Sequence, residues 1–239
     1  MAQWIYGRNT VKSALKEKKV SRIFLTPQWK DDSIIQECRR QNIPIVRKTI
    51  QELDHMVHGV HQGIAAEIDE YQYADMNEVI RNAKEKEFPL LILLDGINDP
   101  HNLGAILRSA DAFGAHGIII GKYDQVGLTS TVAKVSTGAI DHVPVVQVTN
   151  LNQAIRLLQK EGFWIVSSDG SAAHDYREID YKMPVVLVVG SEGKGISRLV
   201  LENSDFIVKI PMCGSVNSLN ASVATAVLLA QIYQNRFPL

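Results

Sequence analysis

The chain has 239 residues, enough for one large domain or two modest ones. Hydrophobic residues make up 46% of it, which supports a full core, and no run of about twenty apolar residues indicates a membrane span. The formal net charge of −1 argues against a general nucleic-acid binder, because such proteins usually carry a basic excess. With two cysteines, no metal-binding cluster and no secretory signal pattern, we expect a cytoplasmic protein without a metal.

Short strands and helices alternate over residues 1–70. The apolar periodicity predicts strands at 22–26, 43–46 and 63–68 and helices at 31–41 and 50–56. This alternation indicates a small α/β domain. Eleven Lys and Arg residues stand here against nine Asp and Glu residues, so this segment is more basic than the remainder.

A polar, charge-rich stretch over residues 71–87 follows, and we expect a linker with an exposed helix there. From residue 88 onward strands and helices alternate again, which is typical of a parallel sheet with helices on both faces. The predicted strands are at 90–94, 117–120, 143–148, 163–167, 185–189 and 206–210, and a helix is predicted at 151–161.

The first group of polar residues follows the strand at 90–94. Pro100 marks a turn, Asn102 is a plausible helix N-cap, and the apolar spacing continues to a C′ residue at Gly114. Arg108 lies within this short helix. It is either a solvated flank or a charge directed at a site above the carboxyl end of the strand, where ligands of parallel sheets bind.

A second group follows the strand at 185–189, in a loop with the glycines Gly190, Gly193 and Gly195. It is not a phosphate loop, because Ile196 stands where that motif requires lysine. It also lacks the third glycine of the dinucleotide fingerprint, which argues against a nicotinamide-dependent oxidoreductase. The glycines would let a neutral or cationic ligand lie against bare backbone, beside the carboxylate of Glu192.

A third group lies near the C-terminus, where the strand at 206–210 runs into a loop of small polar residues. We expect a long apolar helix to begin near Asn217 or Ser218 and to continue through Ala230. Two interpretations fit this stretch, namely a well-capped core helix, or a polar turn that binds a partly hydrophobic, partly polar small ligand.

Together the three groups resemble the signature motifs of the SpoU (TrmH-like) ribose 2′-O-methyltransferases of the SPOUT superfamily. The matching residues are Asn102, Gly104 and Arg108, then Gly190, Glu192, Gly193 and Gly195, then Ile210, Pro211, Met212, Ser218, Leu219 and Asn220. The resemblance covers most of residues 88–239. The segments 7–11 and 61–65 resemble the substrate-binding domain of the branch that methylates a guanosine in 23S ribosomal RNA.

The resemblance implies an L30e-like N-terminal domain that binds large-subunit rRNA by shape and a few placed cations. It implies a C-terminal α/β domain over 88–239, mainly parallel, with a deep trefoil knot and a homodimer interface. The implied methyl donor is S-adenosylmethionine, held by backbone groups near Gly190, Ile210 and Leu219. Thr137 and Gly138 either line the same cleft or form a simple turn.

The resemblance also implies that Arg108 is the catalytic residue. Arginine stays protonated in proteins, so we expect Arg108 to bind the adjacent phosphate and stabilise the developing alkoxide rather than act as a base. Asn102 and Glu192 would orient Arg108 and the ribose. Ser218 and Asn220 would form the polar wall of the site.

His101 is the alternative base because its pKa suits proton removal, but we expect it to be a loop residue. His55, His58 and His61 lack the spacing of a metal site, and we expect a surface or RNA-facing role for them. Two alternative functions remain, which are a tRNA ribose methylase of the same family and a non-catalytic RNA-binding member. The N-terminal α/β domain favours rRNA.

Overall fold

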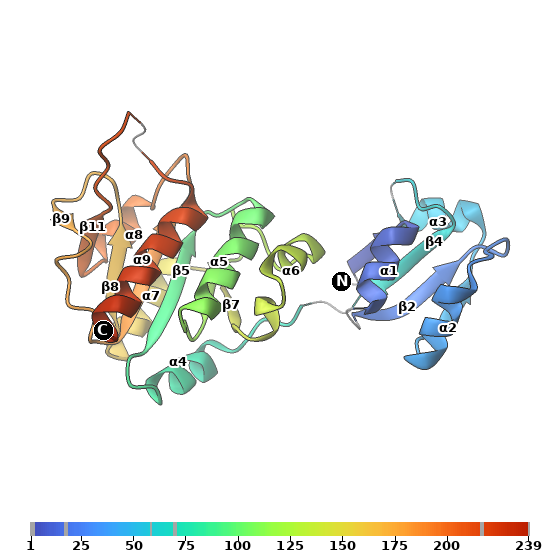
Figure 1. The fold of residues 1–239 in the computed structure, drawn as a ribbon, viewed down its shortest axis with the longest axis horizontal. Helices are drawn as coiled ribbons and strands as arrows, with labels where there is room; N and C mark the ends of the chain where they lie inside the picture. The colour runs from blue at the N-terminus through green and yellow to red at the C-terminus, as the bar shows by residue number, and fades with distance from the viewer. Residues whose placement is uncertain (1–2, 17–18, 58, 69–70, 216–217, 239) are drawn as a thin grey trace. The chain divides into compact units, whose positions relative to one another are not determined.

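The computed structural model describes residues 3–16, 19–57, 59–68, 71–215 and 218–238. The chain divides into an N-terminal unit, Met1–Gln72, and a C-terminal unit, Tyr73–Leu239 (Figure 1). Both units are α/β, as expected. None of the helices in the described part of the chain has the length and hydrophobicity that a bilayer crossing requires.

The N-terminal unit is built on a mixed four-stranded sheet. Its elements are β1 (Gln3–Tyr6), α1 (Arg8–Lys16), β2 (Val20–Leu25), α2 (Asp32–Arg40), β3 (Ile45–Arg47), α3 (Ile50–Met56) and β4 (Ile64–Ile68). The strand order is β1-β4-β2-β3, with β4 antiparallel to β1 and β2, and β2 parallel to β3. The periodicity missed β1 and α1, because β1 has four residues and α1 buries only Val11 and Leu15.

The C-terminal unit contains a seven-stranded sheet. Its elements are α4 (Met76–Lys84), β5 (Leu90–Asp95), α5 (Pro100–Ala112), β6 (Ile118–Gly121), α6 (Ser130–Ser136), the 3-10 helix η1 (Ala139–Asp141), β7 (Val145–Val148), α7 (Leu151–Lys160), β8 (Trp164–Ser168), β9 (His174–Asp175), β10 (Val185–Gly190), α8 (Arg198–Glu202), β11 (Phe206–Lys209) and α9 (Ala221–Arg236). The order is β7-β6-β5-β10-β8-β11-β9, and every pairing is parallel. The predicted parallel sheet is therefore confirmed.

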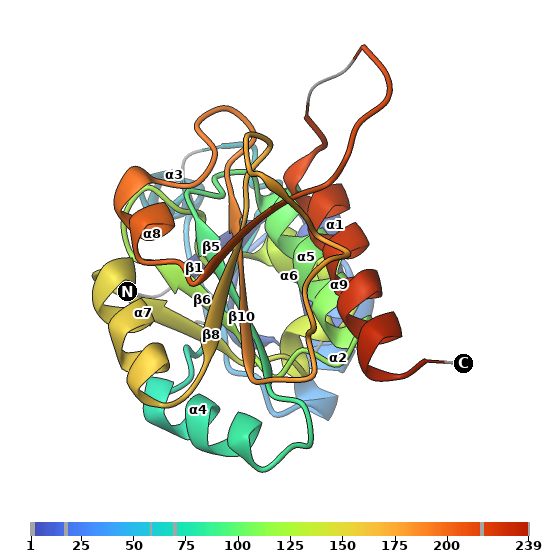
Figure 2. The ribbon, with the colours of Figure 1, turned by 90° about the vertical axis from the view of Figure 1, so that its left-hand side faces the viewer.

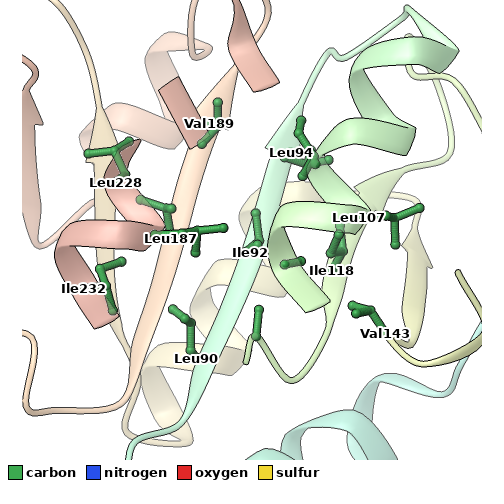
Figure 3. Close-up of a cluster of buried hydrophobic side chains, with 14 of the residues drawn as sticks. Leu90, Ile92, Leu94, Leu107, Ile118, Val143, Leu187, Val189, Leu228 and Ile232 are labelled. Carbon is green, nitrogen blue, oxygen red and sulfur yellow. The ribbon is translucent and has the colours of Figure 1, made fainter. Parts of the chain in front are cut away.

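Alternate residues of the central strands enter two separate cores. On β5, Leu90, Ile92 and Leu94 pack toward α5 and α9, whereas Leu91 and Leu93 pack toward α4, α7 and α8. Figure 2 shows the two sets of helices on opposite faces of the sheet, and Figure 3 shows the first core. This burial on both faces explains why the central strands are continuous apolar runs.

The stretch expected to be a linker belongs to the C-terminal unit. Within residues 73–87, α4 buries Val79, Ile80 and Ala83 in the second core, and Asp75 caps its N-terminus. The charged residues of this segment occupy only the outer face of an amphipathic helix. Composition suggested a linker with an exposed helix, because this stretch contains few apolar residues. The trefoil knot stays a prediction, since the path from β11 to α9 includes residues 216–217, which lie outside the described residues.

Two helix starts differ from expectation. Asp99 rather than Asn102 caps α5, because the Asp99 carboxylate accepts the His101 N–H at 2.8 Å. The helix therefore begins at Pro100, and Asn102 lies in its first turn with its side chain free for other contacts. Its C-terminus agrees with prediction, with Gly114 at φ 70°.

The last helix begins at Ala221 rather than near Asn217 or Ser218, and it ends at Arg236 rather than Ala230. Asn220 caps it by accepting the N–H groups of Ser222 and Val223. The expected start at Asn217 falls on a residue outside the described part of the chain. The C-terminal turns beyond Ala230 are polar on one side. The predicted helix was therefore too short, because the prediction followed the apolar residues.

Arg236 fixes the end of α9 to the amino-terminal edge of the sheet. Its buried guanidinium donates to the carbonyls of Tyr181, Met183, Phe88 and Pro89 at 2.9–3.1 Å. Burial lowers the pKa of Arg236 to about 10. The four carbonyls replace the water that a guanidinium needs, so the last helix is held in one position on the sheet.

Candidate active site

Three loops meet at the carboxyl edge of the sheet. They follow β5, β10 and β11. The sheet order β5-β10-β8-β11 brings these loops together although they are distant in sequence. A cleft of about 590 Å³ opens there, here called the main cleft. It is lined by residues 168–170 at and after the end of β8, by 189–192 and 195 at and after the end of β10, and by parts of 209–224. Its size is that of a pocket for a small ligand.

Asn102, Glu192 and Asn220 are in hydrogen-bond contact beside this cleft. Asn102 lies in the first turn of α5, after the loop that follows β5, whereas Glu192 and Asn220 lie in the loops after β10 and β11. The Asn102 Nδ2 donates to Glu192 Oε1 at 3.0 Å, and the Asn220 Nδ2 donates to Asn102 Oδ1 at 2.9 Å. Asn220 Nδ2 also donates to Glu192 Oε1. The carboxylate thus joins all three motifs, although 90 residues separate Asn102 from Glu192 and 118 separate Asn102 from Asn220.

The Asn220 side chain also caps a helix. Its Oδ1 accepts the N–H of Ser222 at 3.0 Å and of Val223 at 3.3 Å, which satisfies free donors at the start of α9. The Glu192 carboxylate also lies 3.4 Å from the Ala221 N–H. A negative charge at a helix N-terminus is favourable, so α9 and the three polar side chains support each other.

A second cleft of about 560 Å³, here called the acidic cleft, shares Ser191, Glu192 and Gly195 with the main cleft. Asp95, Asp99 and Asp124 also line it. Asn102 and Lys194 line it as well, so its charge is not uniformly negative.

Asp95 was not singled out from the sequence, but it holds the glycine loop in place. It lies at the end of β5 and accepts the Ser197 N–H at 2.7 Å. Ser168, Asp169 and Lys209, which line the main cleft, were also missed. The available signal was their position at or directly after the carboxyl end of a parallel strand.

The motif glycines have packing roles. A Cβ on Gly190 would lie 2.2 Å from the carbonyl carbon of Gly195, so only glycine lets the loop fold back on its own strand. A Cβ on Gly104 would lie 2.6 Å from that of Val135, so this glycine permits the close approach of α5 and α6. Gly190 also lines the main cleft, as Ile210, Ser218 and Leu219 do.

Arg108 is not part of this arrangement. Its side chain is exposed on α5, and it has no hydrogen bond or ion pair with a described residue. The Arg108 side chain lines neither the main cleft nor the acidic cleft. Asn102 and Glu192, which we expect to orient Arg108 and the ribose, both contact Asn220 in the described chain. Arg108 follows Asn102 by six positions on a helix, so the two side chains leave α5 in different directions.

Thr137 and Gly138 lie apart from both clefts. Thr137, at φ 51°, ends α6, and Gly138, at φ 97°, precedes η1. They form the turn that was the alternative interpretation.

The expected surface or RNA-facing role of the clustered histidines does not hold for His61. His61 is buried, and its ring contacts Asp54 and the Gly63 N–H at 3.0 Å each, which is a structural role. His58 lies outside the described residues. Among the described residues, no group of His, Cys, Asp and Glu is arranged to hold a metal ion.

An open parallel sheet with a polar cleft at its carboxyl edge defines an α/β protein that binds a small ligand at its strand ends. Comparison with known proteins identifies the class. Residues 89–230 match the SpoU rRNA Methylase family, and residues 4–74 match the RNA 2′-O ribose methyltransferase substrate-binding domain. The chain belongs to the SpoU rRNA Methylase family. It is thus an RNA 2′-O-methyltransferase with an RNA substrate-binding domain.

Individual relatives support the same family. The chain is 45% identical to YacO of Bacillus subtilis strain 168, a protein assigned to the TrmH family of tRNA/rRNA methyltransferases, over 98% of this chain and 96% of YacO. A Staphylococcus aureus strain COL protein with the same assignment is 44% identical, over 97% and 96%.

Solved structures share the fold. The SpoU methyltransferase AviRb from Streptomyces viridochromogenes, in complex with AdoMet, superposes with a TM-score of 0.73 at 24% identity, over 98% of this chain and 90% of AviRb. An AdoMet-bound rRNA methyltransferase from Sinorhizobium meliloti gives 0.70 at 24% identity, over 99% and 88%. Both contain the methyl donor expected from the sequence.

Proposed function

We propose that the protein methylates the ribose 2′-oxygen of a guanosine in 23S ribosomal RNA, with S-adenosylmethionine bound in the main cleft. The observation that carries this proposal is the contact among Asn102, Glu192 and Asn220. It joins the three motif loops at one edge of the main cleft. The N-terminal unit supports ribosomal RNA as the substrate, because its segments 7–11 and 61–65 resemble the rRNA-methylating branch.

The main cleft fits the methyl donor. Apolar groups of Val189, Ile210 and Leu219 face it together with polar groups of Ser191 and Ser218, as a ligand with an adenine ring and a polar tail requires. The donor supplies a methyl group on a sulfonium, which reacts without further activation. Glu192 lies on the cleft wall, where its negative charge favours a cationic ligand.

What the protein adds is orientation of the ribose and stabilisation of charge. Asn102 and Asn220 are fixed by Glu192 and can hold the ribose hydroxyls. Arg108 would bind the phosphate next to the target ribose and stabilise the oxygen as it loses its proton, with that phosphate or a water accepting the proton. His101 would stay a loop residue.

Arg108 reaches a cleft most simply through a second copy of the chain. It is exposed on α5, against which α9 packs, and α9 exposes Val223 and Tyr233. A homodimer through these helices would cover the apolar side chains and direct Arg108 toward the partner subunit's main cleft. In this arrangement each active site takes residues from both subunits.

The proposed substrate is tested by mapping ribose methyl groups on the RNA of a strain that lacks this protein. We expect the loss of one 2′-O-methylguanosine from 23S rRNA and its return when the wild-type protein is supplied. Loss from tRNA instead would assign the enzyme to tRNA. A complete map in the deletion strain would contradict the catalytic function.

We expect the C-terminal unit to bind the methyl donor and the N-terminal unit to select the RNA. A chain of residues 73–239 keeps α4, whose apolar face completes the second core, together with every residue of the main cleft. We expect it to bind S-adenosylmethionine with near wild-type affinity in calorimetry but to lose most activity on 23S rRNA fragments. Unchanged activity and site choice would show that the N-terminal unit does not select the RNA.

A further inference from the structure

One edge of the N-terminal sheet gathers the loops that carry its most distinctive residues. Because β1, β2 and β3 run in one direction and β4 in the opposite one, the ends of the first three strands and the start of β4 lie at the same edge. The segments there are Gly7 with Arg8, the first residue of α1, after β1, then residues 26–31 after β2, and residues 57 and 59–63 before β4.

These loops are fastened to one another. The Gln62 Oε1 accepts the Arg8 N–H at 3.0 Å, and the Thr26 N–H donates to the Gly63 carbonyl at 3.0 Å. Gly63 is at φ 79°, and a Cβ there would lie 2.8 Å from Thr26 Oγ1, so glycine is required. The segment around 61–63 therefore has a structural role, because it holds the first two loops at fixed positions.

Trp29 is held rigidly within this edge. Its indole Nε1–H donates to the Asp31 carbonyl at 3.1 Å, its backbone N–H donates to the Thr26 carbonyl at 3.1 Å, and part of its ring packs on the core of the unit. The Arg8 guanidinium carbon lies 4.9 Å from the centre of this ring, while the Arg8 Nε is 3.7 Å from the Asp31 carboxylate. Arg8 is thus supported on one face and along one edge.

The other face of Arg8 is accessible, since 54% of its side chain is exposed. Guanidinium planes and aromatic rings are the groups on which proteins stack unpaired RNA bases. The exposed ion pair with Asp31 holds the guanidinium in position along one edge and leaves its other face open. A planar group placed on a rigid indole is suited to stacking.

We propose that Arg8, supported by Trp29, is a stacking site for an unpaired base of the RNA substrate. The inference rests on the proposed function in so far as the N-terminal unit binds the RNA. It adds that this unit selects single-stranded loops over duplexes, and it names the group that does so. Such a site agrees with the net charge of −1, because stacking on a base needs no large basic excess.

Arg22 provides a matched control within the same unit. It lies on β2, its side chain is 52% exposed, and its Nη1 is 3.8 Å from the Glu67 carboxylate. Exposure and ion pairing therefore match those of Arg8 closely. The difference is the indole, because the described residues place no aromatic ring beneath Arg22 in a cation–π contact.

The experiment measures binding of the full chain to a fluorescently labelled RNA hairpin with an unpaired loop, and to a fully paired RNA duplex of the same length. Wild type should prefer the hairpin. Arg8→Ala and Arg8→Lys should each weaken hairpin binding about 5- to 100-fold, since lysine keeps the charge but loses the plane. Arg22→Ala should leave the affinity near that of wild type.

The salt dependence separates stacking from charge. The slope of log affinity against log salt concentration should stay the same in Arg8→Ala, because no phosphate contact is lost. Wild-type affinity in Arg8→Lys, equal losses in Arg8→Ala and Arg22→Ala, or no preference for the hairpin would each overturn the inference. Thermal unfolding of each variant identifies any loss that comes from misfolding, and Arg8→Lys then decides. Methyl transfer by wild type to 23S rRNA, measured separately, tests the proposed function by itself.

Discussion

Arg108→Ala is expected to lower the rate of methyl transfer by roughly a hundredfold or more, with little change in S-adenosylmethionine affinity or thermal stability. The side chain is exposed and makes no hydrogen bond or ion pair with a described residue, so its removal leaves the fold and both clefts unchanged. Its proposed role arises only when a phosphate and a developing alkoxide are present. Single-turnover rates with saturating donor measure the effect.

The assignment of Arg108 to the partner subunit's cleft can be tested by mixing two inactive variants. Arg108→Ala keeps an intact cleft, and Glu192→Gln keeps an intact Arg108. If each site takes its arginine from the other subunit, mixed dimers contain one complete site and activity returns. If the arginine acts within its own chain, every site in the mixture is defective and activity stays low.

His101→Ala is the control for the choice of residue. His101 is exposed in the first turn of α5, and its backbone rather than its ring takes part in the Asp99 cap. The variant should therefore keep most of its activity. A greater loss in His101→Ala than in Arg108→Ala would make the histidine the base.

Gly190→Ala is expected to abolish measurable S-adenosylmethionine binding and to lower the free energy of unfolding by about 1–3 kcal/mol. The added methyl would overlap the Gly195–Ile196 peptide, with its Cβ 2.2 Å from the Gly195 carbonyl carbon. The loop would have to open, which displaces Ser191 and Glu192 from the cleft wall. The sequence suggested a different reason, namely that a side chain here would fill the space of the ligand.

Gly193→Ala is the matched control in the same loop. Its Cβ would meet no atom within 4 Å. We expect unfolding free energy within about 0.5 kcal/mol of wild type and unchanged donor binding. Calorimetry and thermal unfolding of the two variants test both statements. Normal binding by Gly190→Ala would move the donor away from the main cleft.

Much of the fold could be predicted because its signals are local. The apolar runs at 90–94 and 185–189 are strands buried on both faces, and Gly114 follows the end of α5 in the left-handed conformation expected of a C′ glycine. The signals failed where an element is short or its apolar face is narrow. Strand β1 and helix α1 were missed for this reason, and the helix expected within residues 71–87 was taken as exposed although α4 buries one face.

The sequence by itself determined which residues form the three motif loops, because each loop follows directly from a strand whose apolar run is evident. Only the tertiary structure decided what those residues contact. Asn102, Glu192 and Asn220 meet because the sheet order and the position of α9 on α5 bring their loops together. Arg108 has the spacing of its motif, yet it lines neither cleft. The reason is that side chains six positions apart on a helix point in different directions. Spacing along the chain records neither sheet order nor helix orientation, and the contacts of this site depend on both.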